Sequence, residues 1–128
     1  DLFQPVRDGE HGRQVRGEIG FQRDAVHHKL TPEEIAYFHT SDERVSVATL
    51  DGRTLPVDRS LDTLMGQLPA ADFYRANRQF IVSRRAIADL SVWFGSRLTL
   101  NLCVKTPERI VISKARVPEF KRWFLEGV

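Results

Sequence analysis

A β-hairpin pattern over residues 44–57 constrains the fold more than any other feature of the sequence. Its first half, "RVSVATL", alternates apolar and small polar side chains, as a half-buried strand does. Asp51-Gly52 follows, a pair that readily adopts the positive φ angles of a tight turn, and "RTLPV" then returns. The pattern predicts two adjacent antiparallel strands.

A second hairpin pattern joins "ADLSVWF" (88–94) to "RLTLNLCV" (97–104) through Gly95-Ser96 as a two-residue loop. Two or three short helices accompany the strands. Thr31 and Glu34 form a capping-box pattern, Ser60 can cap a helix over 60–69, and "VPEFKRWFLEGV" indicates a terminal helix. The apolar side chains expected to face the core in the last two helices are Leu61, Leu64, Met65, Leu68, Val117, Phe120 and Phe124.

We expect one mainly β domain over residues 19–128, preceded by a linker or N-terminal arm over residues 1–18. The arm combines 3 glycines, 1 proline and many charges without an apolar period. Because the sequence begins at Asp1 and not at methionine, we interpret it as part of a longer protein. No apolar run approaches the ~20 residues that cross a bilayer, although a missing part could tether the protein to a membrane.

The sequence has 1 cysteine, Cys103, so it cannot form an intramolecular disulfide, which agrees with a reducing cytoplasm. Its apolar neighbours favour a small core residue over a nucleophile. The 4 histidines show no metal-ligand spacing, and no nucleophile–base or phosphate-binding motif occurs. We therefore expect no metal, no cofactor and no catalysis; an enzyme using Cys103 or a histidine is the weaker alternative.

Charge is unevenly distributed along the chain. Residues 1–72 hold 8 basic and 13 acidic side chains, a net of −5, whereas residues 73–122 hold 11 basic and 3 acidic ones, a net of +8. A segment this basic in a nearly neutral chain indicates a polyanionic partner. The alternative is a solvated surface whose charges pair with the acidic half.

The segment 73–87, "FYRANRQFIVSRRAI", combines burial and charge. It contains 4 arginines and no acidic residue. Its apolar side chains, which are expected in the core, are Phe73, Phe80, Ile81, Val82 and Ile87.

This segment, read as "DFYRANRQFIVSRRAIADL", resembles the signature of LytTR domains, the DNA-binding output modules of many bacterial response regulators. The resemblance extends over residues 21–126, because "EEIAYF", "DGRTLPVDRSLDTL" and "IVISKARVPEFKRWF" also match in order. It departs at Ser83, Asn77 and Lys114, where the family prefers other polar or basic residues. These departures concern base preference and leave the expected fold unchanged.

The resemblance implies stacked small antiparallel sheets with two or three short helices and no helix-turn-helix, whose loops enter the grooves of double-stranded DNA. It implies a transcriptional regulator with a receiver or membrane sensor elsewhere in the chain, and a homodimer on paired sites. The residues that it places at DNA bases are Arg78, Lys114 and Arg44. Arg84, Arg85, Arg116 and Asn77 are expected at phosphates, although Asn77 equally fits a turn cap, and Arg75 is expected to be structural.

An alternative from a different class remains at this point. A β-rich interaction module could bind an acidic protein or an anionic lipid surface through the same basic face. Salt dependence would not separate the two, whereas preference for one DNA sequence over scrambled DNA would.

Overall fold

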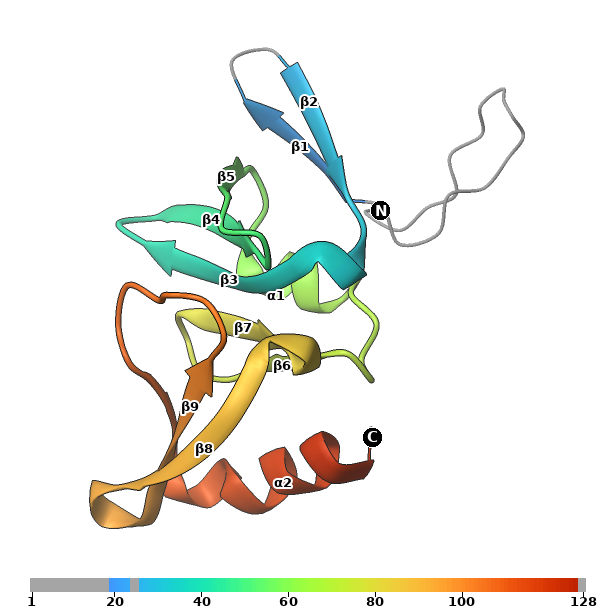
Figure 1. Cartoon of the computed structure of the whole chain (residues 1–128). Coiled ribbons are helices and arrows are strands. Elements are labelled where there is room, and N and C mark those ends of the chain that lie inside the picture. The colour runs from blue at the N-terminus through green and yellow to red at the C-terminus, as the bar shows by residue number, and fades with distance from the viewer. Residues whose placement is uncertain (1–18, 24–25, 127–128) are drawn as a thin grey trace.

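The computed structural model describes residues 19–23 and 26–126, and this part of the chain is mainly β (Figure 1). The strands form a 2-stranded, a 3-stranded and a 5-stranded sheet, each with antiparallel pairing. The expected mainly β fold with few short helices is confirmed. The arm predicted over residues 1–18 lies outside the described residues.

The five-stranded sheet has the order β5-β4-β3-β7-β6 and forms the centre of the domain. Its strands are β3 (Ile35–Ser41), β4 (Arg44–Thr49), β5 (Thr54–Val57), β6 (Phe73–Arg75) and β7 (Phe80–Ser83). The predicted hairpin over 44–57 is therefore present as β4 and β5.

Each face of the five-stranded sheet is covered by its own apolar core. One core packs against α1 (Leu61–Met65), and its buried members all come from residues 30–81 of the sequence. They include Phe38, Phe73 and Ile81. The other packs against α2 (Val117–Glu126) and the three-stranded sheet, with Tyr37, Phe80 and Trp123 among its members. Alternate residues of one strand therefore serve different cores: Val47 faces the first, and Ala48 the second.

The three-stranded sheet has the order β10-β9-β8, with β8 (Ile87–Trp93), β9 (Arg97–Leu102) and β10 (Ile110–Ile112). Figure 1 shows β8 and β9 beside α2, which runs along the lower side of the domain. The remaining sheet is a hairpin of β1 (Ile19–Arg23) and β2 (Val26–Leu30) at the top of the same view.

Cys103 contradicts the sequence-based prediction, because its side chain is exposed and not in the core. β9 ends at Leu102, so Cys103 lies just beyond the strand, whereas the buried Leu98 and Leu100 lie within it. The burial of these apolar neighbours therefore does not extend to Cys103.

The hairpin turns only partly follow the predicted chemistry. Of the pair Asp51-Gly52, Gly52 alone has a positive φ, of 94°. A tight turn that the sequence did not predict lies between β3 and β4, where Asp42 (φ 52°) and Glu43 (φ 63°) link the paired residues Ser41 and Arg44. Two successive positive φ angles are typical of a type I′ turn, which usually contains asparagine and glycine.

The helices are shorter than the sequence pattern predicts. The capping box at Thr31 gives one turn of 3₁₀ helix, in which the Thr31 N–H donates to the Glu34 side chain at 2.9 Å. The Ser60 hydroxyl accepts from the Thr63 N–H at 3.1 Å, and the five-residue α1 ends before Gly66. In α2 the buried residues are Phe120 and Trp123, so Trp123 joins the predicted core side.

Candidate nucleic-acid interface

Two of the loops expected at DNA lie at the same end of the five-stranded sheet. Arg44 directly follows the β3–β4 turn as the first residue of β4, and the β6–β7 loop (residues 76–79) carries Arg78. The Thr40 N–H donates to the Gln79 carbonyl oxygen at 3.0 Å, which places the loop directly beside the start of the turn. Both lie on the left side of Figure 1.

Asn77 shapes the β6–β7 loop and connects it to the three-stranded sheet. Its side-chain oxygen accepts from the backbone N–H groups of Gln79 and Phe80 at 2.8 and 3.1 Å, as in a turn cap. Its amide nitrogen donates to the Val111 carbonyl oxygen of β10 at 3.1 Å. Asn77 thus makes the hydrogen bonds of a turn cap, which is one of the two roles expected for it.

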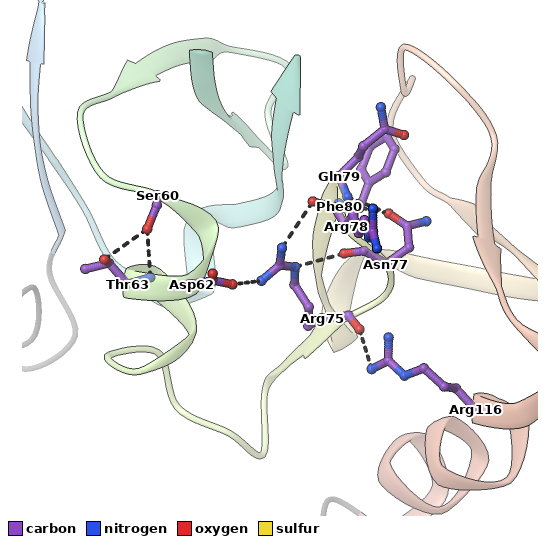
Figure 2. A network of polar contacts seen from close by, with 9 residues as sticks. All are labelled: Ser60, Asp62, Thr63, Arg75, Asn77, Arg78, Gln79, Phe80 and Arg116. Atoms are coloured by element: carbon purple, nitrogen blue, oxygen red, sulfur yellow. Dashed lines mark hydrogen bonds and ion pairs between the residues drawn. The ribbon is translucent and has the colours of Figure 1, made fainter. Parts of the chain in front are cut away.

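Arg75 braces the same loop from the side of α1 (Figure 2). Its guanidinium donates to the carbonyl oxygens of Asn77 at 2.8 Å and Arg78 at 3.1 Å, and forms an ion pair with Asp62 at 2.6 Å. One rigid fork thus satisfies two carbonyl groups and one carboxylate. This geometry agrees with the structural role expected for Arg75.

Arg116 braces the loop from the side of α2. It donates to the carbonyl oxygens of Arg75 at 2.7 Å and Ala76 at 3.3 Å, and its guanidinium lies 5.0 Å from the centre of the Tyr74 ring. Glu119 also lies within 3.5 Å of it. Arg116 therefore joins the segment 113–116, which contains Lys114, to the loop that contains Arg78.

Tyr74 completes this contact between β6 and α2. Its hydroxyl donates to the Glu119 carboxylate at 2.8 Å. Burial, and secondly the hydrogen bond with Glu119, raise the pKa of Tyr74 to about 12. The phenol is thus neutral at physiological pH.

Arg84 is also occupied within the domain. It donates to the carbonyl oxygens of Ala71 and of Trp123 and Phe124 in the last turn of α2, and its guanidinium lies 4.2 Å from the centre of the Trp123 ring. A cation at the carboxyl end of a helix is favourable for the helix dipole and the unpaired carbonyl groups there. Arg84 and Arg116 were expected at phosphates, but the structure gives their guanidinium groups partners in the protein.

Four candidates keep exposed side chains that make no hydrogen bond or ion pair with other described residues; they are Arg44, Arg78, Arg85 and Lys114. Arg78 borders an open hollow of about 510 Å³ between the β6–β7 loop, β10 and the segment that leads into α2. Arg97 lines the same hollow and was not singled out from the sequence. Arg97 lies in a different hairpin from Arg78, so the residues around it in the sequence do not indicate that the two share a hollow.

Arg44 lies beside a different hollow, of about 410 Å³, which it shares with Glu43, Asp58 and Arg59. The acidic neighbours lower the positive potential there. Asp42 and Glu43 form the turn that precedes Arg44.

The enzyme alternative depended on Cys103 or a histidine. The described residues contain no group of three or more metal-ligating side chains. His39 is hydrogen-bonded to Glu108 at 3.2 Å, and the hollow beside the end of β9 is lined by neither Cys103 nor a histidine. No helix within residues 19–23 and 26–126 is long and apolar enough to span a membrane.

The described part of the chain is a mainly β domain in which Arg44 and Arg78 lie near the same end of the central sheet. Comparison with known proteins identifies the family. The family model of the LytTr DNA-binding domain matches residues 26–125. This chain belongs to the LytTR family of DNA-binding domains.

Relatives of known sequence agree. The chain is 33% identical over 90 residues to the sensory transduction protein LytT of Bacillus subtilis, which covers 70% of this chain and 36% of that protein. It is 28% identical over 92 residues to LytT of Enterococcus faecalis, covering 72% and 37%. A LytTr domain structure from Bacillus cereus has the same fold, with a TM-score of 0.71 at 20% identity, covering 88% of this chain and 99% of that one.

Proposed function

We propose that this DNA-binding domain is the sequence-specific output part of a bacterial transcriptional regulator. The matched relatives are sensory transduction proteins, and the chain spans only 36% and 37% of their length. The remainder of the full protein would then be a receiver or a membrane sensor. The domain would act in the cytoplasm, as a pair of copies on a paired site.

The observation that carries the proposal is the exposed Arg78 on a loop braced from three directions. Arg78 is the proposed base reader, because an arginine fork fits the O6 and N7 atoms of guanine. Lys114 is the second candidate and Arg44 the third. Arg85, exposed and without a partner among the described residues, is the proposed phosphate contact.

We propose a bracing role for three of the residues that were expected at phosphates. Arg84, Arg116 and Asn77 donate to backbone carbonyl groups of the domain. We therefore propose that they hold the interface in place and do not contact phosphates. Losing these bonds to reach DNA would leave the carbonyl groups without donors.

Selection from random oligonucleotides with the purified domain tests this proposal. We expect one enriched site, and binding that weakens with salt by about 0.9 log units in affinity per log unit of salt for each phosphate neutralised. Equal affinity for the enriched site and for scrambled DNA would reject specific recognition. That result would instead favour the module that binds an acidic protein or an anionic lipid.

Arg78 and Arg85 then provide a matched pair of variants. Arg78→Ala should cost about 1–3 kcal/mol on the selected site and relax the preference at one position. Arg85→Ala should weaken all sequences nearly equally and lower the salt slope by about one. Equal losses on selected and scrambled DNA for both variants would make Arg78 a phosphate contact.

A further inference from the structure

The tip of the β8–β9 hairpin exposes apolar side chains that the fold itself does not use. Val92 is 81% exposed and Phe94 is 74% exposed. In the described part of the chain, Leu125 on α2 is the one other large apolar side chain with comparable exposure, at 77%. A phenylalanine exposed to this degree does not contribute the free energy that its burial would add to folding. Such a side chain often marks a binding site.

The tip is held in a defined shape. The Arg97 guanidinium donates to the Phe94 carbonyl oxygen at 2.7 Å, and the rings of Trp93 and Phe94 meet edge to face at 4.9 Å. The Arg109 guanidinium in turn lies 4.0 Å from the centre of the Trp93 ring. Phe94 is therefore presented by a network of contacts.

The tip adjoins the proposed DNA surface. Arg97 at its base lines the same hollow as Arg78 and Ser113, the residue before Lys114. In Figure 1 the β8–β9 tip projects on the same side as the β3–β4 turn. DNA bound across Arg78 and Lys114 would pass beside Phe94.

The chemistry of the tip favours DNA over a protein partner. A stable protein interface buries about 800 Å² on each side, whereas the exposed large apolar side chains of this tip are Val92 and Phe94, with Arg97 and Arg109 nearby. Arginines can contact the phosphates of DNA, while an adjacent apolar side chain can pack against the hydrophobic faces of the bases. DNA-binding proteins insert phenylalanine or leucine against base steps in this manner.

We propose that Phe94 is an apolar wedge that enters a groove of the bound DNA and packs against a base step beside the bases read by Arg78 and Lys114. The inference rests on the proposed function of the domain. Arg97 fixes the backbone of Phe94, and the Trp93 ring, which lies under Arg109, packs against the Phe94 ring.

The test compares Phe94→Ala with Leu125→Ala on the DNA site selected by the unchanged domain. Both side chains are exposed, so both variants should keep the melting temperature of the parent. We expect Phe94→Ala to lose roughly tenfold or more in affinity, Phe94→Leu to retain most of it, and Leu125→Ala to bind like the parent. Scanning 2-aminopurine through the site should reveal one step whose fluorescence rises with the parent and not with Phe94→Ala.

The outcomes separate this inference from the proposed function. If the unchanged domain selects no site, the proposed function itself fails. If it selects a site that Phe94→Ala binds as tightly as Leu125→Ala does, the wedge is wrong while sequence-specific binding stands. If Phe94→Ala dissolves a dimer seen by sedimentation without DNA, the tip is a contact between two copies and the wedge is rejected.

Discussion

The β6–β7 loop and the β3–β4 turn lie side by side at one end of the sheet, yet they are held in different ways. The loop is fixed by Arg75, Asn77 and Arg116, whose partners come from α1, β10 and the segment leading into α2. The turn is fixed locally, by the positive φ angles of Asp42 and Glu43.

This difference bears on how each loop meets DNA. The backbone around Arg78 is ordered before binding, so less conformational entropy is lost when its side chain contacts a base. Arg44 follows a turn without such braces and has Glu43 and Asp58 near it. We therefore expect Arg78 to contribute more to specificity than Arg44 does.

The largest expected effect is on stability, from Phe80→Ala at the end of the braced loop. Phe80 is fully buried and contacts the rings of Tyr37 and His39, at centroid distances of 5.8 and 4.6 Å. Its loss should lower the free energy of unfolding by about 3–5 kcal/mol, measured by urea denaturation. Val45→Ala is the control, because Val45 is half-buried beside the β3–β4 turn. An equal loss of unfolding free energy in this variant would show that the loop and the turn do not differ in their contribution to stability.

Arg75→Ala should have the next largest effect, because it removes the donors to two loop carbonyl groups and the partner of Asp62. We expect a loss of about 1–3 kcal/mol in the free energy of unfolding. We also expect broadened base preference at the position read by Arg78, measured by repeating the selection. Arg85→Ala, an exposed arginine of the same segment, should change neither quantity; unaltered stability and preference in Arg75→Ala would show that the brace is dispensable.

Alkaline pH should weaken the brace through Tyr74. Its pKa is raised to about 12, above the ordinary value of 10.0, so the folded state resists ionisation more than the unfolded state does. The associated stability is complete below pH 10 and is lost as the pH rises from about 10 to 12. Melting temperature should therefore fall less over this range in Tyr74→Phe; burial also raises the pKa of Tyr37, so some fall should remain. Identical falls would exclude Tyr74 as a source.

The smallest expected effect concerns the β3–β4 turn. Replacing Asp42-Glu43 by Asn-Gly relieves the cost of two positive φ angles, although glycine adds entropy to the unfolded chain. The free energy of unfolding should rise by up to about 1 kcal/mol, with DNA affinity at the selected site nearly unchanged. A large change in affinity would mean that the turn residues themselves contact DNA.

Much of the fold could be predicted because its signals are local. Strand alternation predicted the hairpin over 44–57, and Ser60 predicted the start of α1. The apolar positions of segment 73–87 are buried as expected, including Phe73 and Phe80. These patterns depend on neighbours within a few residues, which the sequence displays directly.

The partners of the arginines could not be predicted, because they lie far apart in sequence. Arg84 contacts carbonyl groups at 123 and 124, and Arg116 contacts those at 75 and 76. The sequence shows that a segment is basic, but it does not show which guanidinium groups point inward. Composition therefore indicated a polyanionic partner, while the division into bracing and exposed arginines required the fold.

The two cores of the five-stranded sheet also have a consequence for synthesis. The core against α1 is complete once residue 81 has been made, whereas the opposite core needs Phe120 and Trp123. A chain emerges from the ribosome with its N-terminal part first. Tyr37 and Phe80 therefore lack their α2 contacts while some forty further residues are synthesised. During that interval the nascent domain exposes one apolar sheet face, which makes it a candidate client of chaperones at the ribosome exit.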